Sequence, residues 1–141
     1  MSNMKAFLKQ HKKTKPNAFY AASENFLDDD GKPLQWEIKP LSAAENERIK
    51  EECTTIIENG FRKPQVKIDT KRIQAKQVVA SIAFPDLYNA ELQDSYGVKE
   101  PEDLLFAMID NAGDYQNLVM FVLTYSKLNV PLNEKVETAK N

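Results

Sequence analysis

The fold is decided by residues 34–45, which read LQWEIKPLSAAE. Apolar and polar side chains alternate through the first half, which predicts a half-buried strand with one face made of Leu34, Trp36 and Ile38. Pro40 ends this strand. Ser42 and Glu45 then form a capping box, in which each side chain accepts an N–H at the start of a helix. The hydrophobic pattern thus changes from that of a strand to that of a helix, which indicates an α+β fold.

A β-hairpin is predicted upstream of the helix, with the strand just described as its second arm. Residues 19–27 predict the first strand. Residues 28–33 (DDDGKP) supply the turn, because aspartate binds its own backbone and glycine accepts a positive φ. Before the hairpin, Met4–Gln10 predicts a short amphipathic helix with Phe7 and Leu8 on one side, and a basic linker follows it.

The helix after the capping box is predicted to run to about Asn59. Its buried stripe is expected to hold Ile49, Cys53, Ile56 and Ile57. Gly60 stands where a left-handed C-cap is favoured. Residues 61–68 fit an edge strand or an extended connection, because Pro64 excludes a central strand.

Four more helices are predicted. Asp69 is the expected N-cap of the second and Asn89 of the third, while Pro101 fits the first position of the fourth. Phe84-Pro85 ends the second helix, and a last helix runs from about Tyr115 to Leu128. The apolar residues expected to pack inward are Ile73, Val78, Val79, Ile82, Ala83, Leu104, Leu105, Met108 and Ile109.

The predicted architecture is therefore α+β and mainly α, with a small N-terminal β-hairpin or sheet followed by a cluster of about four to five helices. We divide the chain into residues 1–15, a short helix and basic linker, and residues 16–128, a single globular domain. Residues 129–141 are polar and are expected to form a flexible tail.

Composition excludes several classes of protein. The 141 residues are 42% hydrophobic and 28% charged, which is ordinary for a globular domain. The net charge of −2 argues against a dedicated nucleic-acid binder, which usually has a strongly basic face. No signal-peptide pattern and no apolar run near the ~20 residues of a membrane span is found, so we expect no membrane association and a cytoplasmic location.

Three features could carry metal or nucleophilic chemistry, and each has a simpler explanation. Four residues fall at positions of a calcium loop: Asp28, Asp30, Gly31 and Glu37. Phe26 would take the first ligand position, so a hairpin turn is preferred. His11 lies in the basic linker and is expected to be solvated. Cys53, the single cysteine, is expected to be a buried structural thiol rather than a nucleophile.

Two groups of charged residues could bind phosphate or act in acid–base catalysis. The lysines at 9, 12, 13 and 15 would bind phosphates only weakly without aromatic neighbours, so a solvated linker is expected. Six carboxylates could suggest acid–base catalysis, but most of them stand where helix N-termini or exposed faces favour negative charge. They are Asp86, Glu91, Asp94, Glu100, Glu102 and Asp103. We therefore expect no catalytic residues, no metal and no cofactor.

Residues 118–123, LVMFVL, are apolar on every side of the last predicted helix. Such a helix is either sunk in the core or faces a partner on its second side, and both alternatives remain open at this point. If a partner is bound there, the candidate contact residues are Leu118, Met120, Phe121 and Leu123.

Two blocks of sequence resemble the XkdN-like family of phage tail assembly chaperones, found in tailed phages and PBSX-like prophages. The first block is residues 30–33 (DGKP) with residues 36–41 (WEIKPL), and the second is residues 90–97 (AELQDSYG). The motif residues are Trp36, Glu37, Ala90, Glu91, Leu92, Gln93, Asp94, Ser95, Tyr96 and Gly97. The segment 98–103 is more acidic than we expect for the family.

The resemblance implies a function without catalysis. Proteins of this kind bind the long tape-measure protein and keep it soluble in the host cytoplasm until the tail tube forms, and they are absent from the mature virion. The tail-tube protein is a second candidate partner, and a homo-oligomer is left open. A structural tail protein, such as a tube or adaptor subunit, is the first alternative. A small enzyme or a nucleic-acid-binding regulator is the second.

Overall fold

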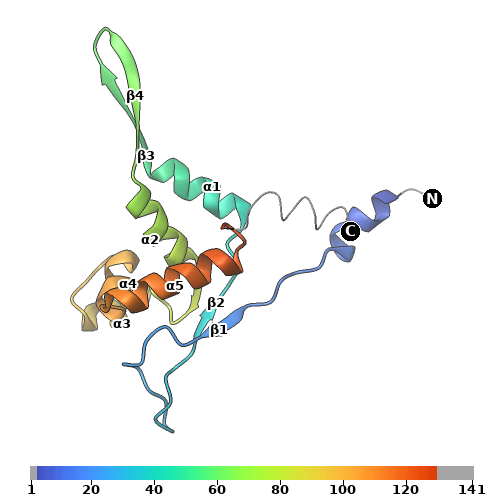
Figure 1. The fold of residues 1–141 in the computed structure, drawn as a ribbon, viewed down its shortest axis with the longest axis vertical. Coiled ribbons are helices and arrows are strands. Elements are labelled where there is room, and N and C mark those ends of the chain that lie inside the picture. The colour runs from blue at the N-terminus through green and yellow to red at the C-terminus, as the bar shows by residue number, and fades with distance from the viewer. Residues whose placement is uncertain (1–2, 130–141) are drawn as a thin grey trace.

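Five α-helices and five strands are formed in the computed structural model, which describes residues 3–129. Figure 1 shows a helical body with one β-ribbon and one N-terminal arm projecting from it. The helices are α1 (Ala43–Glu52), α2 (Thr70–Ser81), α3 (Ala90–Ser95), α4 (Pro101–Met108) and α5 (Ala112–Tyr125). The strands are β1 (Ala18–Tyr20), β2 (Trp36–Ile38), β3 (Thr54–Asn59), β4 (Arg62–Ile68) and β5 (Ile82–Phe84). The predicted α+β, mainly α architecture is confirmed, whereas the polar tail beyond Asn129 lies outside the described residues.

The N-terminal hairpin is confirmed, but its strands are shorter than predicted and a third strand joins them. β1 pairs antiparallel with β2, which in turn pairs with β5. The sequence placed Ile82 and Ala83 in the second helix, and this was wrong. The helix ends at Ser81, and Ile82 and Phe84 pair with β2 instead, because the free edge of β2 offers backbone partners just before Pro85.

The acidic turn between β1 and β2 is a hairpin turn, as predicted. The Asp28 Oδ1 atom accepts hydrogen bonds from the backbone N–H groups of Asp30 and Lys32, each at 2.9 Å. Gly31 has a φ of 78°, which a glycine adopts without strain. On the second strand Trp36 and Ile38 are buried, but Leu34 precedes β2 and is 44% exposed.

The first helix ends earlier than predicted. α1 begins after the predicted Ser42 cap, whose Oγ accepts the N–H of Glu45, but it stops at Glu52 rather than near Asn59. After Cys53, the four residues 54–57 (TTII) are all β-branched and begin strand β3. Two of them, Ile56 and Ile57, are therefore exposed instead of buried.

Helices α2, α3 and α4 begin as the sequence predicts. Asp69, Asn89 and Ser42 each cap a helix through a side-chain oxygen, and Pro101 is the first residue of α4. The last helix differs in its bounds. Its N-cap is Asn111, so α5 starts at Ala112 rather than near Tyr115 and ends at Tyr125 rather than Leu128.

Helix α2 lies at the centre of the body and contacts α1, α4 and α5. The sheet β1-β2-β5 packs its buried side chains into the same core. The core residues are Ala22, Trp36, Ile38, Val78, Val79, Ile82, Leu87, Leu104, Leu105, Met108, Ile109, Leu118, Val119 and Val122. Of the apolar residues predicted for α2, Ile73 is half-buried and Ala83 is exposed in β5.

The N-terminal arm, residues 3–17, forms two short 3-10 helices instead of the predicted amphipathic helix: η1 (Asn3–Phe7) and η2 (Lys9–His11). Every residue of η1 and η2 is exposed. Near its end the arm contacts the body at Tyr125. The Lys15 Nζ atom donates to the Tyr125 carbonyl at 2.6 Å, and the Tyr125 hydroxyl donates to the Pro16 carbonyl.

Within residues 3–129, no helix is both long enough and apolar enough to cross a membrane.

Candidate binding surfaces

The most prominent unpaired surface is the ribbon of β3 and β4, residues 54–68. Every residue in it is exposed, and it projects away from the body (Figure 1). The antiparallel register places Ile56 opposite Val66 and Thr54 opposite Ile68. Because alternate residues of a strand share a face, Ile56, Val66 and Ile68 lie on one face, which we call the apolar face of the ribbon. Their side chains are 64%, 63% and 56% exposed.

The opposite face of the ribbon is more polar. It carries Ile57, which is 40% exposed, between Thr55, Gln65 and Lys67. Phe61 is at the tip and is fully exposed. Gly60 precedes it with a φ of 64°, at the first central position of the two-residue turn, where a type II′ turn places glycine. The ribbon therefore presents an aliphatic face and an aromatic tip to solvent.

The two outer edges of the ribbon differ in their capacity to pair with another strand. Within the described part of the chain neither edge has a strand partner. The β4 edge carries Lys63, Pro64 and Lys67, which are residues that discourage strand addition. The β3 edge has Glu58 as its single charge, so it is the more open of the two.

The base of the ribbon is held by α1 and α2. The backbone N–H of Asp69 donates to the Cys53 carbonyl at 2.9 Å, and the Arg72 Nη1 atom donates to the Glu52 carbonyl at 3.2 Å. Cys53 itself is buried, as predicted for a structural thiol. These contacts fix the direction in which the ribbon leaves the body.

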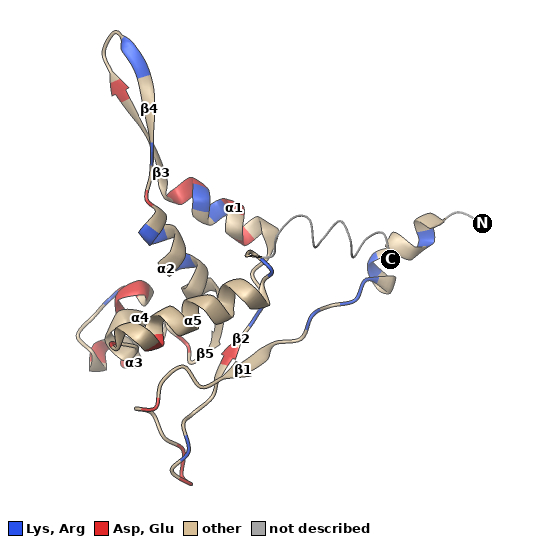
Figure 2. Cartoon of the chain, in the orientation of Figure 1, with Lys and Arg blue, Asp and Glu red and all other residues tan. Residues whose placement is uncertain are grey.

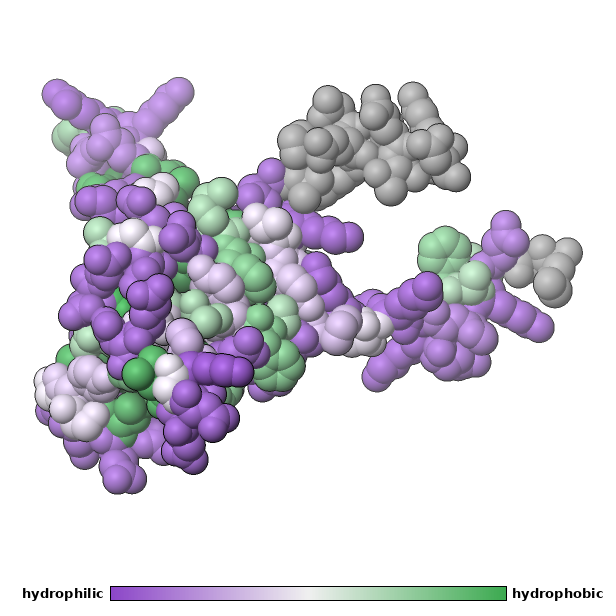
Figure 3. Space-filling model, turned by 60° about the horizontal axis from the view of Figure 1, so that its bottom comes forward, coloured by the Kyte–Doolittle hydropathy of each residue, from purple (hydrophilic) through white to green (hydrophobic). Residues whose placement is uncertain are grey.

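The four candidate contact residues of α5 do not form one surface. Leu118 is fully buried in the core, whereas Met120 is 55% exposed. Phe121 is half-buried and stacks on Tyr20, with ring centroids 4.4 Å apart, and on Tyr125, with centroids 5.9 Å apart. Leu123 is half-buried against the core. Figure 3 shows hydrophobic side chains gathered in the middle of this view of the body, between hydrophilic regions.

The motif residues 90–97 form α3 and the turn after it, and their contacts are local. The Gln93 Nε2 atom donates to the Leu87 carbonyl at 2.8 Å, and the Ser95 hydroxyl donates to the Leu92 carbonyl at 2.7 Å. Gly97 has a φ of 68° and follows the end of the helix. In the first motif block Trp36 is buried and Glu37 is half-buried on the sheet. The hydrogen bonds of Gln93 and Ser95 stabilise α3 and the segment before it.

The sequence contains a signal for the ribbon, although the helical spacing of its apolar residues favoured a helix. Residues 54–57 are four β-branched residues in succession, and Asn59-Gly60 is a dipeptide typical of hairpin turns. Ile56 nevertheless stands at helical spacing from Ile49 and Cys53. Short apolar runs fit either period, so the pattern alone favoured the longer helix.

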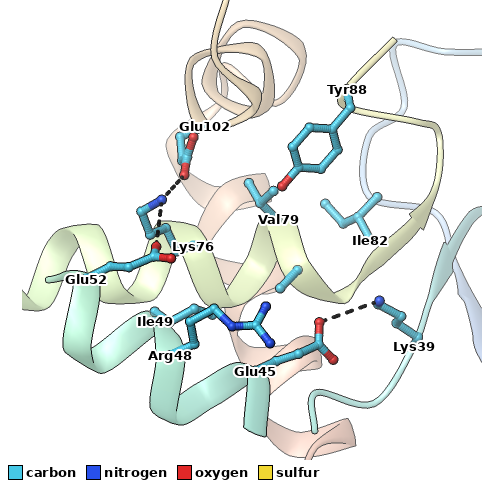
Figure 4. A pocket seen from close by; sticks show the side chains of 11 residues that line it. Lys39, Glu45, Arg48, Ile49, Glu52, Lys76, Val79, Ile82, Tyr88 and Glu102 are labelled. Atoms are coloured by element: carbon cyan, nitrogen blue, oxygen red, sulfur yellow. Dashed lines mark ion pairs between the residues drawn. The ribbon is translucent and has the colours of Figure 1, made fainter.

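A polar cavity of about 250 Å³ lies where α1, α2 and α4 meet (Figure 4). The Lys76 Nζ atom lies 3.0 Å from Glu102 and 3.4 Å from Glu52, and Lys39 pairs with Glu45 at 3.6 Å. The hydrogen bond with Glu102 raises the pKa of Lys76 above its ordinary value, and Glu52 adds to this effect against the opposing cost of burial. The two ion pairs of Lys76 link α2 to α1 through Glu52 and to α4 through Glu102, so we assign them a structural role.

Replacing Lys76 by methionine is expected to lower the free energy of unfolding by about 1–2 kcal/mol, because two carboxylates lose their shared cation. Among residues 3–129, Lys50 forms an ion pair with the exposed Glu47 alone, so Lys50→Met should cost no more than about 0.5 kcal/mol and serves as the control. Urea unfolding at pH 8 measures both. Equal effects of the two substitutions would contradict the assignment.

The pH dependence of the difference in unfolding free energy between wild type and Lys76→Met provides a second check. The raised pKa of Lys76 means that the folded chain holds this proton more tightly than the unfolded chain. The stabilisation is complete below the unfolded value of 10.5 and is lost as pH rises through the folded value. Burial also raises the pKa of Tyr115, so wild type and Lys76→Met should be compared at each pH to isolate the lysine.

No group of three or more His, Cys, Asp or Glu side chains suited to a metal ion occurs in residues 3–129. The ribbon is the principal candidate for function because its apolar face is exposed, and its chemistry is that of a hydrophobic protein–protein contact.

A family model, two curated proteins and one solved structure are similar to this chain. A family model described as phage XkdN-like tail assembly chaperone protein matches residues 4–140. The phage-like element PBSX protein XkdN of Bacillus subtilis (strain 168) is 24% identical over 120 residues, covering 84% of this chain and 80% of that protein. The uncharacterized protein YqbN of the same organism is 22% identical over 119 residues, with the same coverage. A crystal structure of YqbN has the same fold, with a TM-score of 0.78 and 16% identity over 90% of this chain and 98% of the other.

Proposed function

Because the chain belongs to the phage XkdN-like tail assembly chaperone family, we propose that it binds the phage tape-measure protein and keeps it soluble during tail assembly, without catalysing a reaction. It acts in the cytoplasm of the host and leaves before the virion is complete. The tail-tube protein is a further partner to test.

The observation that carries this proposal is the apolar face of the ribbon. Ile56, Val66 and Ile68 are each more than half exposed, although aliphatic side chains of a folded domain gain about 1.5–3 kcal/mol each from full burial. Contiguous exposed apolar surface usually marks a site that a partner covers. A long helical tape measure that is apolar along one side is a partner of matching chemistry.

The dimensions of the ribbon suit a helix. Ile56 and Val66 face each other across the two strands, with side chains separated by about 5 Å, and Ile68 follows about 7 Å along β4. Apolar residues at i, i+3 and i+4 of a helix lie about 5–6 Å apart. The apolar face therefore offers contacts at the spacing of one helical stripe, and Phe61 extends the contact at the tip.

Co-expression with the tape-measure protein encoded in the same gene cluster tests the proposal. We expect the tape measure to become soluble, to co-purify with this chain, and to aggregate when expressed alone. Finished particles should lack the chain by mass spectrometry. A tape measure that stays insoluble and unbound, together with this chain in finished particles, would support a structural tail protein instead.

A further inference from the structure

The N-terminal arm is a second surface that the body leaves uncovered. Its described residues 3–17 contain five lysines, one histidine and no carboxylate: Lys5, Lys9, His11, Lys12, Lys13 and Lys15. Phe7 is 80% exposed and Leu8 is 47% exposed. In Figure 3 the arm stands apart from the body and carries hydrophobic side chains among hydrophilic ones. Helical segments this short are not stable without tertiary contacts, so a partner surface would stabilise them.

A groove of complementary character lies beside α3. Its volume is about 430 Å³, and it is lined by Phe84, Pro85 and Leu92 together with the carboxylates of Asp86 and Glu91. These two are the only ionisable groups among its lining residues. Phe84 is 60% exposed, so the apolar floor of the groove is open to solvent.

The wider surface around this groove has the same sign of charge. Residues 86–114, which contain α3 and α4, hold eight carboxylates and a single lysine. Figure 2 shows the acidic residues around α3 and α4 on one side of the body and the basic arm on the other. The groove between α2 and α4 is a weaker match for a basic segment, because Lys71, Arg72 and Lys76 line it beside its carboxylates Asp69, Glu100, Glu102 and Asp103.

We propose that the N-terminal arm of one copy docks in the α3 groove of a second copy. Phe7 and Leu8 cover Phe84 and Leu92, and Lys5, Lys9, Lys12 and Lys13 face the acidic surface that surrounds the groove. Lys15 keeps its contact with Tyr125 of its own chain. Charge complementarity between the two surfaces selects this occupant over an unrelated peptide. This inference is independent of the proposed tape-measure binding.

The arrangement is head-to-tail, because the arm and helix α3, beside which the groove lies, are on opposite sides of the body in Figure 2. A contact of this kind joins each copy to the next and produces either a closed ring or an open row. Each copy in such an assembly would still present its own ribbon, so an assembly would place several apolar faces side by side.

Sedimentation velocity of the full chain over a range of concentrations tests the proposal. We expect association that strengthens with protein concentration and weakens at least tenfold between 50 mM and 500 mM salt, because the contact is between opposite charges. The arm variant is Phe7→Ser/Leu8→Ser, and the groove variant is Phe84→Ser/Glu91→Lys. Each alone should weaken association at least tenfold while the circular dichroism spectrum is unchanged.

Mixing the two variants gives the sharpest result. The arm variant keeps an intact groove and the groove variant keeps an intact arm, so the mixture should form a one-to-one heterodimer and nothing larger. If the groove variant loses its native spectrum, Glu91→Lys alone replaces it. A chain that stays monomeric at all concentrations, whether because the arm lies in its own groove or binds nothing, overturns the proposal. Association that both variants leave unchanged overturns it as well.

Discussion

Changing Ile56 and Val66 to threonine is expected to weaken binding of the tape-measure protein at least tenfold. Threonine is also β-branched, so the strands keep their propensity, while each change removes apolar surface from the exposed face of the ribbon. Each loss is worth about 1 kcal/mol or more at a contact that excludes water, and together they exceed the 1.4 kcal/mol that corresponds to tenfold. Pull-down, and titration of the tape-measure protein with purified wild type and variant, measure the change in affinity.

The matched control is Ile57→Thr on the opposite face of the same strand. It makes the same chemical change within one residue of Ile56, so it shares any effect on strand stability. We expect it to alter binding less than threefold, and we expect all variants to unfold within about 0.5 kcal/mol of wild type. If Ile57→Thr weakened binding as much as the double variant, the face assignment would be wrong and the ribbon would bind by its edge or tip.

The second large effect concerns stability rather than binding. Leu118→Ala is expected to lower the free energy of unfolding by about 3 kcal/mol, because Leu118 is fully buried and its removal leaves a cavity among packed side chains. Chemical denaturation followed by circular dichroism measures this loss. The effect is a large fraction of the ~5–15 kcal/mol that stabilises a typical domain, so expression of this variant should also fall.

Met120→Ala is the comparison for Leu118→Ala on the same helix. Met120 is 55% exposed, so its truncation should cost no more than about 1 kcal/mol. Together, Leu118→Ala and Met120→Ala distinguish burial of α5 in the core from contact of α5 with a partner. A loss below about 1 kcal/mol for Leu118→Ala would mean that this side of α5 is not packed in solution. Binding lost by Met120→Ala alone would add α5 to the partner surface.

Local sequence signals predicted the helix starts well. Ser42, Asp69 and Asn89 cap their helices through interactions that reach only three residues along the chain. Pro101 at the first position of α4 is equally local. Such positions can be predicted without knowledge of the tertiary structure, because the cap and the backbone groups to which it binds lie within one turn.

Helix ends and short strands were harder to predict. Ile56 fits a helical stripe with Ile49 and Cys53, and it equally fits a strand opposite Val66. Its final state depends on Arg62–Ile68, which returns along β3 and supplies its hydrogen bonds. β5 was missed for the same reason, since Ile82 pairs with Ile38, far away in the sequence.

For the candidate site as well, the local sequence pattern was predictable, whereas the exposure of each side chain was not. Residues 118–123 showed that α5 is apolar on every side, but burial of Leu118 beside exposure of Met120 depends on which elements pack against each side. The apolar face of the ribbon could not be inferred while Ile56 and Ile57 were placed inside a helix. The motif at 90–97 was found by resemblance, and the local contacts of its side chains are visible only in the fold.

The fold class, the starts of helices α1 to α4 and the family were readable from the sequence, because capping interactions and motif residues act over a few positions. Only the tertiary structure decided that residues 54–68 leave the body as a ribbon and that Phe7 and Leu8 of the arm remain uncovered. An apolar side chain carries the same local pattern whether it is buried or exposed. Its exposure is set by chain segments distant in sequence that either cover it or leave it to a partner.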